Sequence, residues 1–73
     1  MTTIERILVV DDEPGIRELL RRICLREGYD VATAADGGEA VAALHQAPFA
    51  LALVDLRLPD MDGIEVLRAA REL

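Results

Sequence analysis

Several residue types are rare or missing in this sequence of 73 residues, and each absence excludes a class of protein. The one cysteine, Cys24, cannot form an internal disulfide or a cysteine-based zinc site, which fits a reducing compartment. No run approaches the roughly 18 apolar residues of a membrane span, and no secretion signal opens the chain, so we expect a cytoplasmic protein without membrane contact. All basic residues are arginine, and the formal net charge of −6 disfavours direct binding to nucleic acid.

Three segments have the composition of β-strands. Residues 7–10 and 50–54 are short runs of apolar residues, which are typical of strands buried between two layers of helices. Residues 30–34 mix polar and apolar side chains, which favours a strand near the edge of a sheet. Tyr29 and Phe49 each come directly before a strand, where an aromatic side chain commonly closes the end of a core.

Three further segments carry the signals of helices. The first begins at Pro14, which the first turn of a helix tolerates, and stops at Gly28. Its apolar residues recur at helical spacing and are expected to face the sheet: Ile16, Leu19, Leu20, Ile23 and Cys24. The second and third helices begin at capping boxes, in which an aspartate precedes a glutamate by three residues, namely Asp36 with Glu39 and Asp62 with Glu65.

The alternation of strands and helices predicts the fold class. A β-α-β-α-β-α order with right-handed connections gives a parallel α/β sheet and leaves few alternatives. Among these we expect a flavodoxin-like α/β fold, with a three-layer parallel sheet in strand order 2-1-3. In that order the strand at 50–54 lies at an edge, yet it lacks the charges, proline and polar alternation that protect edge strands. We therefore expect a fold truncated after its third βα unit, whose exposed edge at 50–54 promotes self-association.

Three aspartates follow the two apolar strands. Asp11 and Asp12 come directly after the strand at 7–10, and Asp55 comes directly after the strand at 50–54. Neighbouring strands lie about 4.8 Å apart, so these carboxylates are expected to gather at the carboxyl edge of the sheet, where ligands of open α/β sheets bind. An all-oxygen, partly hydrated site is what Mg²⁺ prefers. The alternative is that Asp11 and Asp12 only cap the following helix and that Asp55 only begins a turn.

Three groups of residues resemble a known family: Ile7-Leu-Val-Val-Asp-Asp12, Val54-Asp55 and Leu58-Pro59-Asp-Met-Asp-Gly63. Their order and spacing are similar to those of the receiver domain of bacterial two-component response regulators. The resemblance covers essentially the whole chain. It implies that residues 1–73 are a partial receiver domain made of its first three βα units.

The resemblance also implies a role for each acidic residue. Asp55 is similar to the family's phosphoryl acceptor, Asp12 and Asp55 would bind Mg²⁺ directly, and Asp11 would act through a bound water. The backbone carbonyl of Arg57 would complete the metal ligands, while Pro59 and Gly63 would shape the loop. The phosphoryl donor would be a histidine kinase or a phosphotransfer protein, and the chain would be a phosphoacceptor module and not an enzyme.

The sequence departs from the family in one respect. Complete receivers hold the phosphoryl group with a serine or threonine after the fourth strand and a lysine after the fifth, whereas this sequence has no lysine or serine, and Thr2, Thr3 and Thr33 lie outside the expected site. One alternative is thus a phosphorylation-incompetent fragment that serves as an interaction or structural module. Another is a Mg²⁺-dependent phosphatase with an aspartate nucleophile, but such enzymes place a second aspartate where this chain has Arg57.

Overall fold

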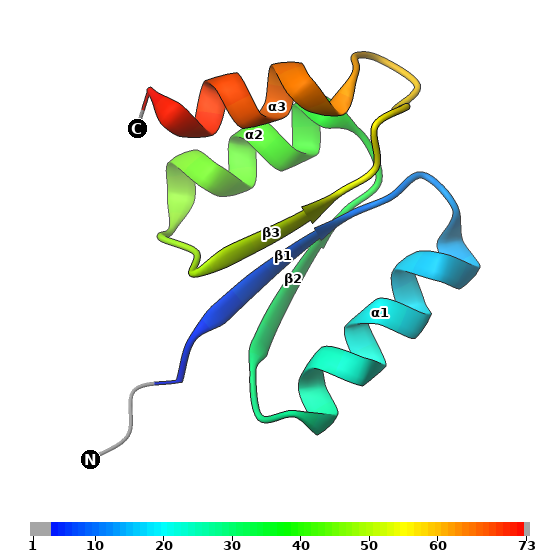
Figure 1. The fold of residues 1–73 in the computed structure, drawn as a ribbon, viewed down its shortest axis with the longest axis vertical. Coiled ribbons are helices and arrows are strands. Elements are labelled where there is room, and N and C mark those ends of the chain that lie inside the picture. The colour runs from blue at the N-terminus through cyan, green and yellow to red at the C-terminus, as the bar shows by residue number, and fades with distance from the viewer. Residues whose placement is uncertain (1–3, 73) are drawn as a thin grey trace.

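The computed structural model describes residues 4–72, which form three strands alternating with three helices (Figure 1). The elements are β1 (Arg6–Val10), α1 (Pro14–Arg26), β2 (Asp30–Ala34), α2 (Gly37–Gln46), β3 (Leu51–Val54) and α3 (Gly63–Arg71). These bounds confirm the predicted strands and helices to within a few residues. Across residues 4–72, no helix is long and apolar enough to cross a membrane.

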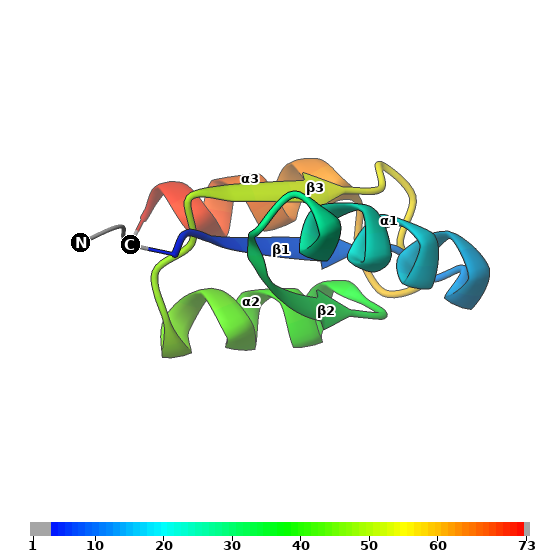
Figure 2. The ribbon, with the colours of Figure 1, turned by 90° about the horizontal axis from the view of Figure 1, so that it is seen from below.

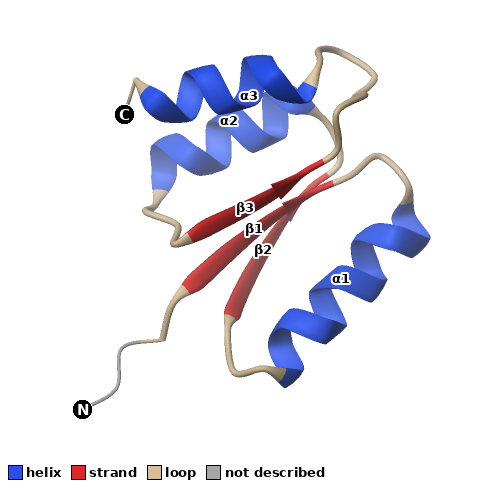
Figure 3. Cartoon of the chain, viewed as in Figure 1, coloured by secondary structure: helices blue, strands red, loops and turns tan. Residues whose placement is uncertain are grey.

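The strands form one parallel sheet with β1 in the middle, in the order β2-β1-β3 (Figure 3). This confirms the predicted strand order and orientation. Val10 at the end of β1 is opposite both Ala34 of β2 and Val54 of β3. The carboxyl ends of the strands are therefore level, and the loops that follow β1 and β3 leave from the same edge of the sheet.

Helices cover both faces of the sheet: α1 lies on one face, and α2 and α3 lie on the other (Figures 1 and 2). Side chains alternate between the faces of a strand, so β1 supplies both cores. Beneath α2 and α3 the buried residues are Leu8, Val10, Ala34, Ala40 and Val66. Beneath α1 they are Ile7, Val9 and Cys24, and Leu20, Val31 and Leu53 pack against them. Cys24 is thus a core residue.

Several apolar residues are more exposed than the sequence predicts. On α1, Leu20 and Cys24 pack on the sheet, but Ile16, Leu19 and Ile23 remain 48–57% exposed because α1 is the one helix on this face among the described residues. On β3, Leu51 is 52% exposed and no residue is fully buried, because β3 is the edge strand that the predicted order implies. Helices nevertheless cover both of its faces, as predicted: Leu53 packs beneath α1, and Ala52 and Val54 pack beneath α2 and α3.

The two aromatic side chains differ in their surroundings. Phe49 packs against the core beneath α2 and α3, as predicted, and the Arg6 guanidinium lies 5.1 Å from its ring centroid. The prediction that Tyr29 is a core residue is wrong, because the side chain is 40% exposed. Tyr29 follows Gly28, whose φ of +91° turns the chain from α1 into β2, and this places the ring at the rim of the sheet.

The basic face of α1 is paired within the helix. The side chains of Arg21 and Arg22 donate hydrogen bonds to the carboxylate of Glu18 at 2.7–3.0 Å. These hydrogen bonds lower the pKa of Glu18 to about 2, and the bond from Arg21 has the larger effect. All three side chains are in contact with solvent, so the pairs contribute little to stability.

Candidate functional site

The sheet places three aspartates at one edge. Asp11 and Asp12 follow β1 directly, and Asp55 follows β3. Backbone hydrogen bonds extend the strand pairing one residue further, from Asp55 N–H to the Val10 carbonyl (2.9 Å) and from Asp11 N–H to the Ala34 carbonyl (3.1 Å). The backbone positions of Asp11 and Asp55 are therefore set by the sheet, and Asp12 follows Asp11 directly.

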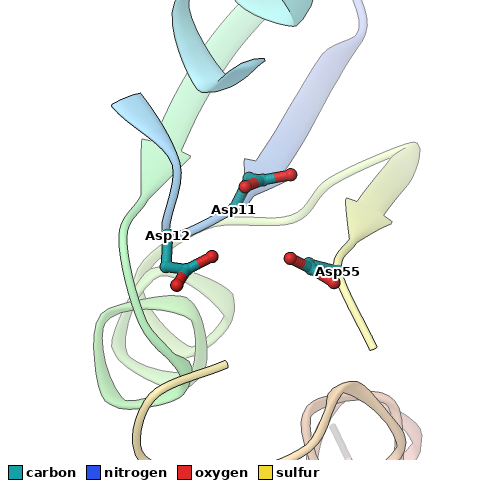
Figure 4. A group of neighbouring side chains, drawn as sticks. All are labelled: Asp11, Asp12 and Asp55. Carbon is teal, nitrogen blue, oxygen red and sulfur yellow. The ribbon is translucent and has the colours of Figure 1, made fainter. Parts of the chain in front are cut away.

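The three carboxylates lie close together. Each residue offers one oxygen, and these oxygens are within 4.8 Å of one another. Figure 4 shows the carboxylates of Asp12 and Asp55 pointing toward each other, with that of Asp11 beside them. Asp11 and Asp55 are half-buried and Asp12 is exposed. The convergence predicted from the strand order is present, and it concentrates negative charge that a cation would offset.

Helix capping does not account for this cluster. The N-cap of α1 is Glu13, whose side chain accepts a hydrogen bond from Gly15 N–H, so neither Asp11 nor Asp12 caps the helix. Asp11 instead accepts from Glu13 N–H at 2.9 Å, and its own carbonyl accepts from the Arg17 guanidinium at 2.8 Å. Asp55 Oδ1 accepts from Arg57 N–H at 3.1 Å. These bonds orient Asp11 and Asp55 and leave carboxylate oxygens free to bind a ligand.

The donor set fits Mg²⁺. Ligands of an octahedral Mg²⁺ at about 2.1 Å are at most about 4.2 Å apart, only slightly less than the bound of 4.8 Å seen here. A carboxylate that acts through a water can lie further from the ion. One oxygen from each of the three aspartates could thus bind a single ion, directly or through a water. Arg57 contacts this cluster through its N–H to Asp55.

The loop between β3 and α3, residues 55–62, is held in a compact shape. Arg57 and Asp62 form an isolated antiparallel bridge, and Leu58 N–H donates to the Met61 carbonyl at 3.2 Å. Gly63 N–H donates to the Leu56 carbonyl at 2.9 Å. A side chain at Gly63 would collide with the carbonyl oxygen of Asp55, so this approach requires glycine.

Asp60 is a residue of this region whose contacts sequence reasoning missed. Its carboxylate accepts hydrogen bonds from Gly37 N–H (2.8 Å) and Gly38 N–H (2.9 Å) at the start of α2. These two bonds lower the pKa of Asp60. No local pattern reveals them, because the partners are 22 and 23 residues away. The one signal in the sequence is the pair of adjacent glycines, Gly37 and Gly38, at the start of the helix that Asp60 contacts.

The threonines are not part of the cluster. Thr33 lies on β2, on the opposite side of β1 from β3. Thr2 and Thr3 lie outside the described residues. Thr33, the one threonine of residues 4–72, therefore supplies no hydroxyl group to the cluster.

Comparisons with known proteins agree with this geometry. Residues 7–73 match the response regulator receiver domain family. The transcriptional regulatory protein ResD of Bacillus subtilis is 49% identical over 71 residues, which are 97% of this chain and 30% of that protein. A CheY-like receiver domain from Methanospirillum hungatei has a TM-score of 0.93 at 43% identity, covering 96% of this chain and 56% of that one.

A third similar protein was crystallised with a metal. The response regulator TrrA of Thermotoga maritima, in complex with Mg²⁺-BeF, has a TM-score of 0.89 at 42% identity, covering 94% of this chain and 60% of that one. The chain therefore spans less than two thirds of each of these relatives.

Proposed function

This chain belongs to the response regulator receiver domain family, and we propose on that premise that it accepts a phosphoryl group on Asp55 with the help of Mg²⁺. The donor would be a histidine kinase or a phosphotransfer protein, and the acceptor reaction would regulate an output that lies outside this chain. We further propose that the chain corresponds to the first three βα units of a receiver. Its coverage of 56–60% of the solved receivers supports this assignment.

The observation that carries the proposal is the convergence of the three carboxylates within 4.8 Å at the ends of two neighbouring strands. Exposed acidic residues are common, but three carboxylates that gather at one sheet edge make an oxygen-rich site suited to a hard cation. Asp11, Asp12 and Asp55 would hold the ion, and the carbonyl of Arg57 is the fourth ligand that the family implies. When bound, Mg²⁺ neutralises charge on the oxygens of an incoming phosphoryl group.

The residues of the chain would then orient the acceptor. Arg57 N–H holds Asp55 Oδ1 at 3.1 Å, which leaves Oδ2 as the nucleophile. Oδ2 attacks the phosphorus of a phosphorylated imidazole, the O–P bond forms as the N–P bond breaks, and the imidazole leaves with a proton from solvent. Holding the carboxylate in one orientation lowers the entropic barrier to this transfer. The product is an acyl phosphate on Asp55.

One observation favours a second function, that of a phosphorylation-incompetent interaction module. The sequence has no lysine, so an acyl phosphate on Asp55 would lack the cation that receivers use to hold it. We therefore expect the phosphoryl group on this chain to be weakly populated and short-lived.

Time-resolved intact-mass spectrometry tests the proposal. The chain is incubated with Mg²⁺ and an excess of a small acyl phosphate, and samples are quenched within seconds to minutes. A small population carrying one added phosphoryl group is expected, and it should be lost in Asp55→Asn and when Mg²⁺ is chelated. Asp36→Asn, which changes a carboxylate outside the cluster, should label like the wild type.

Two results would contradict the assignment of Asp55. Equal labelling of the wild type and Asp55→Asn would remove this residue from the reaction. No labelling of the wild type at any time would favour the interaction module.

A further inference from the structure

The start of α2 is capped from two different parts of the chain. The first four N–H groups of a helix have no partner inside it. In α2 the side chain of the N-cap residue Asp36 accepts from Glu39 N–H at 2.8 Å, and the first bond within the helix runs from Ala40 N–H to the Asp36 carbonyl at 3.1 Å. The N–H groups of Gly37 and Gly38 donate to Asp60 in the loop between β3 and α3. The helix terminus is complete only with this loop in place.

The same loop contacts the acidic cluster at its other end. Arg57 lies three residues before Asp60, and its N–H orients the carboxylate of Asp55. The bridge between Arg57 and Asp62 closes the loop on itself and so joins the two sides of its base. A continuous set of hydrogen bonds thus runs from α2 through Asp60 and the loop backbone to Asp55.

A second contact fixes the tip of the loop. The side chain of Met61 packs so closely on Gly37 that a Cβ atom there would collide with it. Met61 also packs against the core beneath α2 and α3. The loop is therefore held on α2 by the apolar contact of Met61 and by two charge-assisted hydrogen bonds. Both hydrogen bonds are accepted by the side chain of Asp60.

We propose that Asp60 is a positioning residue for the acidic site: by tying the β3–α3 loop to the first turn of α2, it holds the Arg57 backbone where it orients Asp55 and completes the metal ligands. Asp60 itself touches neither the metal nor the phosphoryl group. The proposal rests on the proposed function, because it assumes that Asp11, Asp12 and Asp55 bind a divalent cation.

In this proposal Asp60 does more than cap α2, because it also connects the helix to the loop that orients Asp55. α2 already has a cap in Asp36, and the side chain of Glu39 accepts from Ala35 N–H just before it at 2.9 Å. A residue that served only the helix would affect the metal site no more than Asp36 does. A positioning residue would affect it more, and the coupling would be reciprocal, because linkage between two sites acts equally in both directions.

Mg²⁺ affinity is the first readout, measured on the isolated chain by calorimetric titration. Asp60→Ala should weaken binding by on the order of tenfold, the lower end of the effect of residues that support metal ligands from outside. The matched control is Asp36→Ala, which removes one capping bond from the same turn of α2 and leaves the loop attached. It should change the affinity by less than about twofold. Asp60→Asn keeps one acceptor oxygen and should fall between the wild type and Asp60→Ala.

Amide hydrogen exchange is the second readout and does not depend on activity. In the wild type, Mg²⁺ should slow exchange at Gly37 and Gly38, whose N–H groups donate to Asp60. In Asp60→Ala this protection should be lost, while exchange in β1 stays slow and shows that the fold is retained. If Asp60→Ala does not fold, Asp60→Asn provides the same comparison.

The outcomes separate this inference from the proposed function. Asp12→Asn serves as the reference for loss of the metal site. If the wild type binds Mg²⁺ more tightly than Asp12→Asn but Asp60→Ala binds like the wild type or like Asp36→Ala, the positioning role is wrong and the metal site stands. If the wild type and Asp12→Asn bind alike, the metal site and the positioning role are both wrong.

Discussion

Replacing Gly63 with alanine tests how closely the β3–α3 loop and α3 are packed beside Asp55. A Cβ at this position would collide with the carbonyl oxygen of Asp55 and would lie 3.1 Å from the Cα of Leu56. Both obstacles are backbone atoms of the segment that carries the proposed acceptor, so they cannot swing aside as a flexible side chain could.

The magnitude follows from two opposing effects. Alanine in place of glycine favours a helix by up to about 1 kcal/mol. Inserting an atom into a filled space costs roughly 1–3 kcal/mol. We expect Gly63→Ala to lower the free energy of unfolding by about 1–2 kcal/mol. The matched control is Gly15→Ala in α1, where the new Cβ would lie 3.6 Å from Glu13 Oε1 in ordinary contact, and this variant should be as stable as the wild type or slightly more stable.

Urea unfolding followed by circular dichroism measures the difference. For so small a domain the free energy of unfolding falls by about 1 kcal/mol per M urea, so the urea midpoint of Gly63→Ala should fall by roughly 1–2 M. Mg²⁺ binding should weaken in the same variant, because the backbone at Asp55 must shift. A Gly63→Ala chain with the midpoint of Gly15→Ala would refute the close approach described here.

Two further predictions concern acid and association. The N–H groups of Gly37 and Gly38 lower the pKa of Asp60 from its ordinary value of 3.8, so the contribution of this carboxylate to stability is present above that value and is lost as the pH falls below it. The urea midpoint should therefore drop on acidification below about pH 4, and less steeply in Asp60→Asn; an identical pH profile in that variant would contradict this. The outer edge of β3 has no strand partner within residues 4–72, so sedimentation velocity should show self-association of the chain that rises with concentration and is reduced in Leu51→Lys, which places a charge at the edge. A single monomeric species at all concentrations would contradict that.

Features that depend on neighbouring residues could be predicted from the sequence. The caps predicted at Asp36 and Asp62 form as expected, with N–H groups three residues later donating to them at 2.8 and 3.0 Å. The reciprocal half of the capping box differs at α2, where Glu39 accepts from Ala35 N–H and not from Asp36 N–H. The convergence of Asp11 and Asp55 needed one more step, the strand order, which alternation and right-handed connections narrow to a few alternatives.

Features that depend on distant parts of the chain could not be predicted. The exposure of Ile16 and Leu19 on α1 depends on how many elements cover that face, which helical spacing does not reveal. The hydrogen bonds of Asp60 depend on the path of a loop relative to a helix 22 residues earlier. Neither is encoded in a local pattern, so both required the three-dimensional structure.

The account depends most on a metal site made by Asp11, Asp12 and Asp55. Paramagnetic broadening by Mn²⁺ in the NMR spectrum of the ¹⁵N-labelled chain tests it directly. Substoichiometric Mn²⁺ should first broaden the amide signals at the ends of β1 and β3, excess Mg²⁺ should restore them, and Asp12→Asn should weaken both effects. Broadening centred on other acidic residues, or unchanged in Asp12→Asn, would show that the cation binds elsewhere.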